Sequence, residues 1–179
     1  MKKSIILNGL IGGIISISGF FILEGTGGNS HGTLSMVVGY ASMLLAFSLI
    51  YVAIKNYRDK ENGGFISFSQ ALKAGLLIAL ITSTVYVVAW LIYSAYFSPD
   101  FIEQYSKAVL NSMAKEGKSA AEIQAKAAEM KEFAAMYNNP FLKIAITYTE
   151  VLPLGIIISI ITVLILKKKD ITHEAVTNN

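Results

Sequence analysis

The chain has 179 residues and a net charge of +3, with 54% apolar and 15% charged residues. Soluble domains average about 25% charged residues, so the composition excludes a protein whose whole surface faces water. The lysines follow or precede apolar runs and form no patch with interleaved aromatics, which argues against nucleic acid as a partner. The chain has no cysteine, which excludes disulfides, thiolate metal sites and cysteine nucleophiles.

Four segments are long and apolar enough to cross a membrane, which takes about 20 mainly apolar residues. They cover residues 4–23, 34–54, 72–97 and 144–166. The third contains one charge, Lys73, and the fourth contains one, Glu150. The predicted fold class is therefore all-α. We expect an integral membrane four-helix bundle in one domain, residues 1–170, followed by a polar tail at residues 171–179.

The first segment has a cleaved signal peptide as its alternative, because Lys2 and Lys3 precede it. Its apolar run is long, however, and no Ala-x-Ala cleavage site follows it. The sequence Glu24-Gly25-Thr26-Gly27-Gly28 is more typical of a loop after an uncleaved helix. We therefore interpret the segment as the first membrane span.

The basic residues alternate from loop to loop. They occur at the N-terminus, at residues 55–60 and at residues 167–169, whereas residues 24–33 contain none. Since Lys and Arg accumulate on the cytoplasmic side of short loops, both termini are predicted to be cytoplasmic, in a multi-pass protein of the cell (inner) membrane. Segment 98–143 is then outside. Its six lysines make it the one loop that dissents from the rule, but its six acids and its length make it the weakest test of that rule.

Aromatic residues favour the same arrangement, because amphipathic rings prefer the headgroup level. Trp90, Tyr93, Tyr96 and Phe97 gather at the predicted outer end of the third span. At the inner end, Ser67-Phe68-Ser69-Gln70 fits a capping box. The third helix is therefore predicted to begin before its apolar run.

Residues 98–142 are predicted to form an extracytoplasmic helical hairpin. Ser98 is expected to cap its first helix, with Pro99 at the first position, and Gly117 to end it. A second capping box at Ser119 opens the second helix, which Asn138-Asn139-Pro140 ends. Apolar stripes at helical spacing run along both helices: Phe101, Tyr105, Val109 and Met113, then Ile123, Ala127, Met130, Ala134 and Tyr137. They fit packing on each other and the span ends, on the membrane surface, or on a partner.

Small residues recur at four-residue spacing in three of the spans. They are Gly9 and Gly13 in the first, Ala71, Gly75, Ala79 and Ser83 in the third, and Gly155 and Ser159 in the fourth. Such faces let helix backbones approach closely within a membrane. A compact bundle explains them, and so does a homo-oligomer.

Glu150 is the one acidic residue well inside a predicted span, roughly 9 Å from its start at 1.5 Å per residue. Pro153 follows, and it deprives the Thr149 carbonyl of its usual donor. One interpretation is a proton or cation site in a transport path. The other is a structural carboxyl bonded to Tyr40, Ser42 or Tyr86. Glu24 and His31 lie on the same predicted side and are candidates to join this site.

No Ser-His-Asp set, phosphate-binding glycine loop or His-Glu-x-x-His motif is present, so no enzyme, metal or cofactor is predicted. The motifs at residues 36–45, 55–60 and 64–75, together with Glu150-x-x-Pro153-x-Gly155, resemble bacterial membrane proteins grouped as domain of unknown function 4199. The resemblance covers nearly the whole chain. It implies a four-span protein of the cytoplasmic membrane, mostly from Bacteroidota, and it implies no activity.

Two functions remain open from the sequence. The first is a structural or interaction protein in the lipid bilayer, whose outer hairpin meets a membrane-protein partner or a second copy. The alternative is a small transporter or channel subunit that uses Glu150.

Overall fold

A computed structural model describes residues 1–25 and 33–167 of the chain. These residues form six α-helices and a short π-helix, and none of them forms a β-strand, which confirms the predicted all-α class. The elements are α1 (Lys2–Gly25), α2 (Thr33–Asn56), η1 (Tyr57–Glu61), α3 (Phe68–Tyr96), α4 (Phe101–Lys115), α5 (Ala120–Tyr137) and α6 (Pro140–Leu166).

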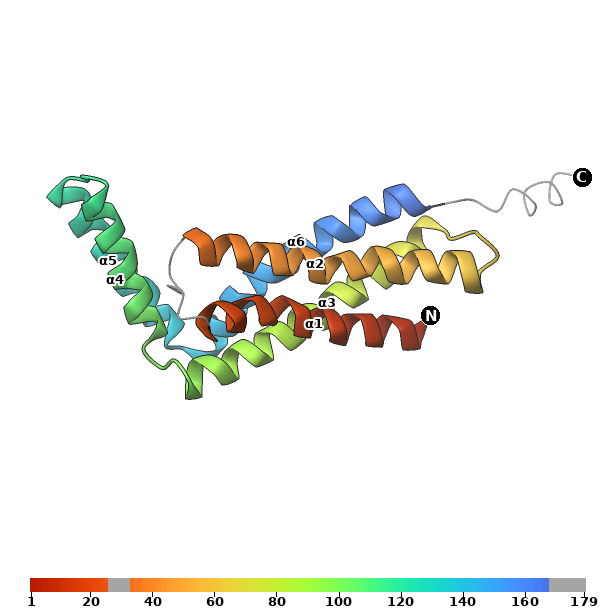
Figure 1. The fold of residues 1–179 in the computed structure, drawn as a ribbon, viewed down its shortest axis with the longest axis horizontal. Helices are drawn as coiled ribbons and strands as arrows, with labels where there is room; N and C mark the ends of the chain where they lie inside the picture. The colour runs from red at the N-terminus through yellow and green to blue at the C-terminus, as the bar shows by residue number, and fades with distance from the viewer. Residues whose placement is uncertain (26–32, 168–179) are drawn as a thin grey trace, which may run out of the picture.

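Four of the helices, α1, α2, α3 and α6, run alongside one another as a bundle, and α4 and α5 leave it at one end (Figure 1). We call α4 and α5 the hairpin, and the end of the bundle from which they leave the hairpin end. The opposite end, where α1 and α3 begin and α2 and α6 finish, is the terminal end. These four helices are long and apolar enough to cross a membrane, as predicted. The 29 residues of α3 extend about 43 Å, which matches a bilayer with its headgroup layers.

Two of the long helices begin earlier than their apolar runs because polar residues cap them. The Ser67 side chain accepts from the Gln70 amide, and Gln70 reaches back to Ser67, so α3 begins at Phe68. The last span was predicted from residue 144, whereas α6 begins at Pro140. Asn139 explains the difference, since its side-chain oxygen accepts from two amides of the first turn.

Of the two helix starts that were predicted in the hairpin, the structure confirms that of α5 and corrects that of α4. Ser119 and Glu122 form the expected capping box, and Gly117 ends the preceding helix with a positive φ of 75°. The start at Ser98 and Pro99 was wrong, because α4 begins at Phe101 with Asp100 as its N-cap. The amides of Phe97 and Ser98 both donate to the Tyr93 carbonyl. Ser98 therefore belongs to the turn that closes α3.

The small residues bring helices of one chain together. A Cβ added at Gly9 would lie 2.7 Å from Cβ of Ile81 on α3, and one added at Gly13 would overlap Val85 on the same helix. A Cβ added at Gly155 of α6 would lie 2.8 Å from Cβ of Ala79 on α3. The faces that suggested either a bundle or a homo-oligomer are thus used inside the bundle.

Hydroxyl groups in the bundle find acceptors on helix backbones. Thr82 of α3 donates to the Gly9 carbonyl of α1 at 3.1 Å, and Ser159 donates to Gly155 at 2.7 Å. Within the described residues, the buried Ser83 hydroxyl is the one buried side-chain group without a hydrogen-bond partner. Satisfied polar groups are what a water-free environment requires.

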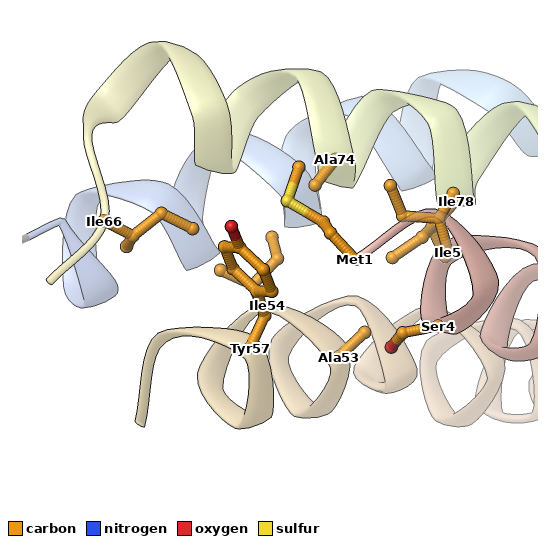
Figure 2. Close-up of a pocket in the computed structure, with 9 residues that line it drawn as sticks. All are labelled: Met1, Ser4, Ile5, Ala53, Ile54, Tyr57, Ile66, Ala74 and Ile78. Atoms are coloured by element: carbon orange, nitrogen blue, oxygen red, sulfur yellow. The ribbon is translucent and has the colours of Figure 1, made fainter. Parts of the chain in front are cut away.

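A small apolar pocket lies near the terminal end (Figure 2). Met1 and Tyr57 project into the space between α2 and α3. Its other lining residues are Ser4, Ile5, Ala53, Ile54, Ile66, Ala74 and Ile78. About 10 Å³ is open to the centre of a water-sized molecule, which is at the lower limit for holding one water. We interpret it as a packing gap.

We predict that Gly13→Ala destabilises the bundle, because the new methyl group would overlap Val85 at a point where backbone must move. Overpacking of this kind costs about 1–3 kcal/mol. Gly39→Ala is the matched control, since an added Cβ there meets nothing within 4 Å. The measurement is the free energy of unfolding in mixed detergent micelles. Equal stability of the two variants would contradict the close approach of α1 to α3.

Candidate functional site

The predicted site at Glu150 lies on α6 toward the hairpin end. Leu166, the last residue of α6, is about 24 Å away along the helix axis. The side chain of Glu150 is exposed on the bundle surface, as are those of Thr149 and Pro153. α6 stays helical through Pro153, so the proline removes an amide donor without ending the helix.

The expected hydrogen bond from Glu150 to a neighbouring helix is not formed. Among the described residues, no hydrogen bond or ion pair reaches its carboxyl group, although Tyr40, Ser42 and Tyr86 are all described. Ser42 instead donates to the carbonyls of Ser16 and Gly39. The structure therefore shows no bond from Glu150 to any of these three residues, and a structural role for its carboxyl group stays a prediction.

Tyrosines nevertheless lie within the electrostatic range of Glu150. Its charge acts on Tyr86 of α3 and on Tyr137 of α5, and Tyr40 of α2 acts on Tyr86 as well. The hydroxyl groups of Thr84 and Tyr148 lie 2.8 Å apart and join α3 to α6 in the same region. The carboxyl group thus has phenol groups from two other helices, Tyr86 of α3 and Tyr137 of α5, within its electrostatic range.

The side chains of Glu24 and His31, the other two predicted members of this site, lie outside the described residues. The backbone of Glu24 belongs to α1, but its side chain lies outside the described residues, and so does all of His31. Over residues 1–25 and 33–167, no group of three or more His, Cys, Asp or Glu residues is arranged to hold a metal ion.

An aromatic cluster at the base of the hairpin was not predicted. It joins Phe20 of α1, Trp90 and Tyr93 of α3, and Phe101 of α4. The ring centres of Phe20 and Tyr93 are 4.9 Å apart, and those of Trp90 and Phe101 are 4.8 Å apart in an edge-to-face arrangement. Such pairs contribute about 0.5–1.5 kcal/mol each beyond their burial. The cluster therefore fixes where the hairpin begins.

Tyr137, the last residue of α5, joins the second helix of the hairpin to this cluster. Its hydroxyl oxygen accepts a hydrogen bond from Nε1 of Trp90, and Nζ of Lys143 lies 4.8 Å from its ring centre. Burial, with a smaller contribution from Glu150, raises the pKa of Tyr137 to about 12. The phenol therefore keeps its proton at neutral pH and remains a neutral partner for the indole.

This cluster corrects the predicted aromatic belt. Trp90 is 7% exposed and Tyr93 is 4% exposed, so neither faces lipid. Tyr96 and Phe97 are 81% and 75% exposed, and Phe141 is 82% exposed where α6 begins. The positions at 90 and 93 fall on the bundle-facing side of α3, which the sequence pattern of a uniformly apolar helix did not reveal.

A family model described as "Protein of unknown function (DUF4199)" matches residues 7–168. The chain belongs to the DUF4199 family. The match runs from the first turns of α1 to just beyond α6 and so includes both the bundle and the hairpin. No curated protein and no solved structure matches the chain. Family and helices together identify a multi-pass membrane protein.

We predict that Tyr137→Phe loosens the hairpin from the bundle. The change leaves the buried indole N–H of Trp90 without its acceptor, at a cost of about 1–3 kcal/mol. Hydrogen exchange of the α4 and α5 amides should become faster. Tyr96→Phe is the control, because its ring is 81% exposed, and it should leave exchange unchanged. Unaltered exchange in Tyr137→Phe would show that this bond does not hold the hairpin.

Proposed function

We propose that this DUF4199 protein is a non-catalytic interaction protein that presents its hairpin to a partner protein. The observation that carries the proposal is the way the hairpin is held. Aromatic rings from α1 and α3 hold the start of α4, and Trp90 holds the end of α5. The turn between α4 and α5 projects away from the bundle (Figure 1). A fixed base and a projecting tip suit a surface for docking.

The two helices of the hairpin differ in the faces that they leave uncovered. α5 buries Met130 and Tyr137 on one side. Its opposite side carries an exposed row at heptad-like spacing of three and four residues: Ala121, Ala125, Ala128, Glu132 and Ala135. Small side chains let another helix approach closely. The uncovered side of α4 is charged instead, and it includes the ion pair of Lys107 with Glu103.

A helix-bearing membrane protein, either another protein or a second copy of this chain, fits the α5 row best. An alanine surface gives little apolar area of its own, so it suits a partner that supplies larger side chains. The charge balance of residues 98–143, with six lysines and six acids, gives no electrostatic reason for nucleic acid or another polyanion to bind there.

We propose that the hairpin lies on the extracytoplasmic side of a bacterial cytoplasmic membrane, with both termini in the cytoplasm. The support is the charge at the terminal end, where lysines and Arg58 outnumber the acids Asp59 and Glu61. Such an excess is typical of cytoplasmic loops.

Ala128→Arg tests the docking role. A long charged side chain in the exposed row should reduce the complex that the chain forms in mildly solubilised membranes by about tenfold, which corresponds to 1.4 kcal/mol. The readout is the native mass of the complex. Asn111→Arg introduces the same residue on the exposed side of α4 and should leave the mass unchanged. Equal masses for wild type and both variants would count against a partner on α5.

A second candidate function, a small transporter or channel subunit, is favoured by one observation. The carboxyl group of Glu150 has no hydrogen bond or ion pair within the described residues, and it lies in the predicted span within the electrostatic range of Tyr86 and Tyr137. Unpaired intramembrane carboxyls are costly and mark ion or proton paths.

Glu150→Gln separates this candidate from the first, because it removes the charge and keeps the shape. If Glu150 carries protons or cations, flux into vesicles under an imposed gradient should fall about tenfold or more, which corresponds to a rise of roughly 1.4 kcal/mol in the barrier. Glu132→Gln on the exposed side of α5 is the control. Flux that is the same in wild type and Glu150→Gln removes the transport candidate, and it leaves the docking role untouched.

A further inference from the structure

The terminal end of the bundle carries a set of cations that acids do not balance. The cations are Lys2, Lys3, Lys55, Arg58, Lys60, Lys73 and Lys167, against two acids, Asp59 and Glu61, in the described part of that end. The hairpin segment, residues 98–143, has six lysines and six acids. Positive charge is therefore concentrated at one end of the molecule.

The cations at this end differ in what they contact. The guanidinium of Arg58 is bound by protein groups: Nε lies 2.6 Å from Oδ1 of Asp59, and a terminal nitrogen donates to the Leu166 carbonyl at 3.2 Å. It thereby caps the C-terminus of α6, where positive charge is favourable. Lys55, Lys73 and Lys167 are exposed, and none of them forms an ion pair with another described residue.

These lysines lie on the outer perimeter of the bundle. Nζ of Lys167 is 5.9 Å from the ring centre of Phe68, and Nζ of Lys55 is 6.0 Å from that of Tyr51. Phe68 is 45% exposed and Tyr51 is 36% exposed, as expected of rings at the headgroup level of a bilayer. Lys73 is exposed in the second turn of α3. Exposed ammonium groups from α2, α3 and the end of α6 therefore lie at the terminal end, at the level where headgroups are expected if these helices span a bilayer.

We propose that the terminal end of the bundle binds the phosphate groups of anionic phospholipids through Lys55, Lys73 and Lys167. Each ammonium group has three donors for phosphate oxygens. Lipids with a net negative charge are favoured over zwitterionic lipids, whose own cation competes for the phosphate. Basic residues next to a membrane span attract anionic headgroups in this way. The site is separate from the hairpin and does not depend on the docking role.

The test measures lipid preference directly. The full chain is reconstituted in phosphatidylcholine vesicles that contain spin-labelled phosphatidylglycerol, and the immobilised fraction gives the preference for the anionic lipid. We expect a preference of about fivefold or more for the wild type, in line with the electrostatic attraction of a basic residue at a membrane surface. It should fall in the variant K55Q/K73Q/K167Q, and it should weaken in the wild type when salt is raised.

Two further variants make the result specific. K115Q/K118Q/K131Q removes three exposed hairpin lysines without ion pairs to described residues and should keep the full preference. K55R/K73R/K167R keeps the charge and should also keep it. A preference that survives in K55Q/K73Q/K167Q, or that falls equally in the hairpin variant, overturns the proposal. If the triple glutamine variant does not fold, the three single variants are measured, and an unchanged preference in all of them overturns it too.

Discussion

Lipid chains are as apolar as leucine side chains, so burial of apolar surface does not hold helices together inside a bilayer. Close contact between backbones must supply much of the attraction, and in this protein glycine makes that contact available. Gly9 and Gly13 face Ile81 and Val85 along the seam between α1 and α3. The Thr82 hydroxyl bonds to the Gly9 carbonyl in the same seam. Interhelical hydrogen bonds in membranes average about 0.6 kcal/mol, so the close approach matters more than this single bond.

The same seam determines where the hairpin begins. Further along α1 and α3, Phe20 packs edge-to-face on Tyr93 and on Trp90. Trp90 in turn contacts Phe101 and Tyr137, which begin α4 and end α5. A displacement of α1 from α3 at Gly13 would therefore move Phe20 relative to the other rings of the aromatic cluster. The orientation of the hairpin relative to the bundle therefore depends on packing between α1 and α3 as well as on the turns that join it to the bundle.

The sequence predicts well where the helices of this fold lie along the chain. It predicts poorly which side of each helix contacts the other helices. Length, apolar content and the Ser67 and Ser119 capping boxes define elements through local chemistry, and the structure has them where expected. Which side of a uniformly apolar helix faces its neighbours is a tertiary property. Trp90 was therefore predicted to lie at the headgroup level, although its side chain is buried in the bundle. The contribution of Phe20 was missed for the same reason, since nothing in its neighbourhood distinguishes it from Phe21.

Glu150 shows how the position of a charged residue along a span bears on its cost and its role. A carboxylate at the centre of a span costs about 2.5–3.5 kcal/mol on insertion scales, and one hydrogen bond in a membrane contributes far less. A bond to Tyr86 would not have offset that cost, so the lack of one is a weak argument against a structural role. The position of Glu150 along α6 says more about its role than this missing bond does. Glu150 lies about 24 Å from Leu166 along α6, toward the hairpin end of the bundle, and its charge acts on Tyr137 at the hairpin base. A change of charge at Glu150, whether from a proton or a bound cation, would act on the residue that holds α5 to Trp90. The carboxyl group and the hairpin therefore belong to one connected region, although their proposed functions are tested separately.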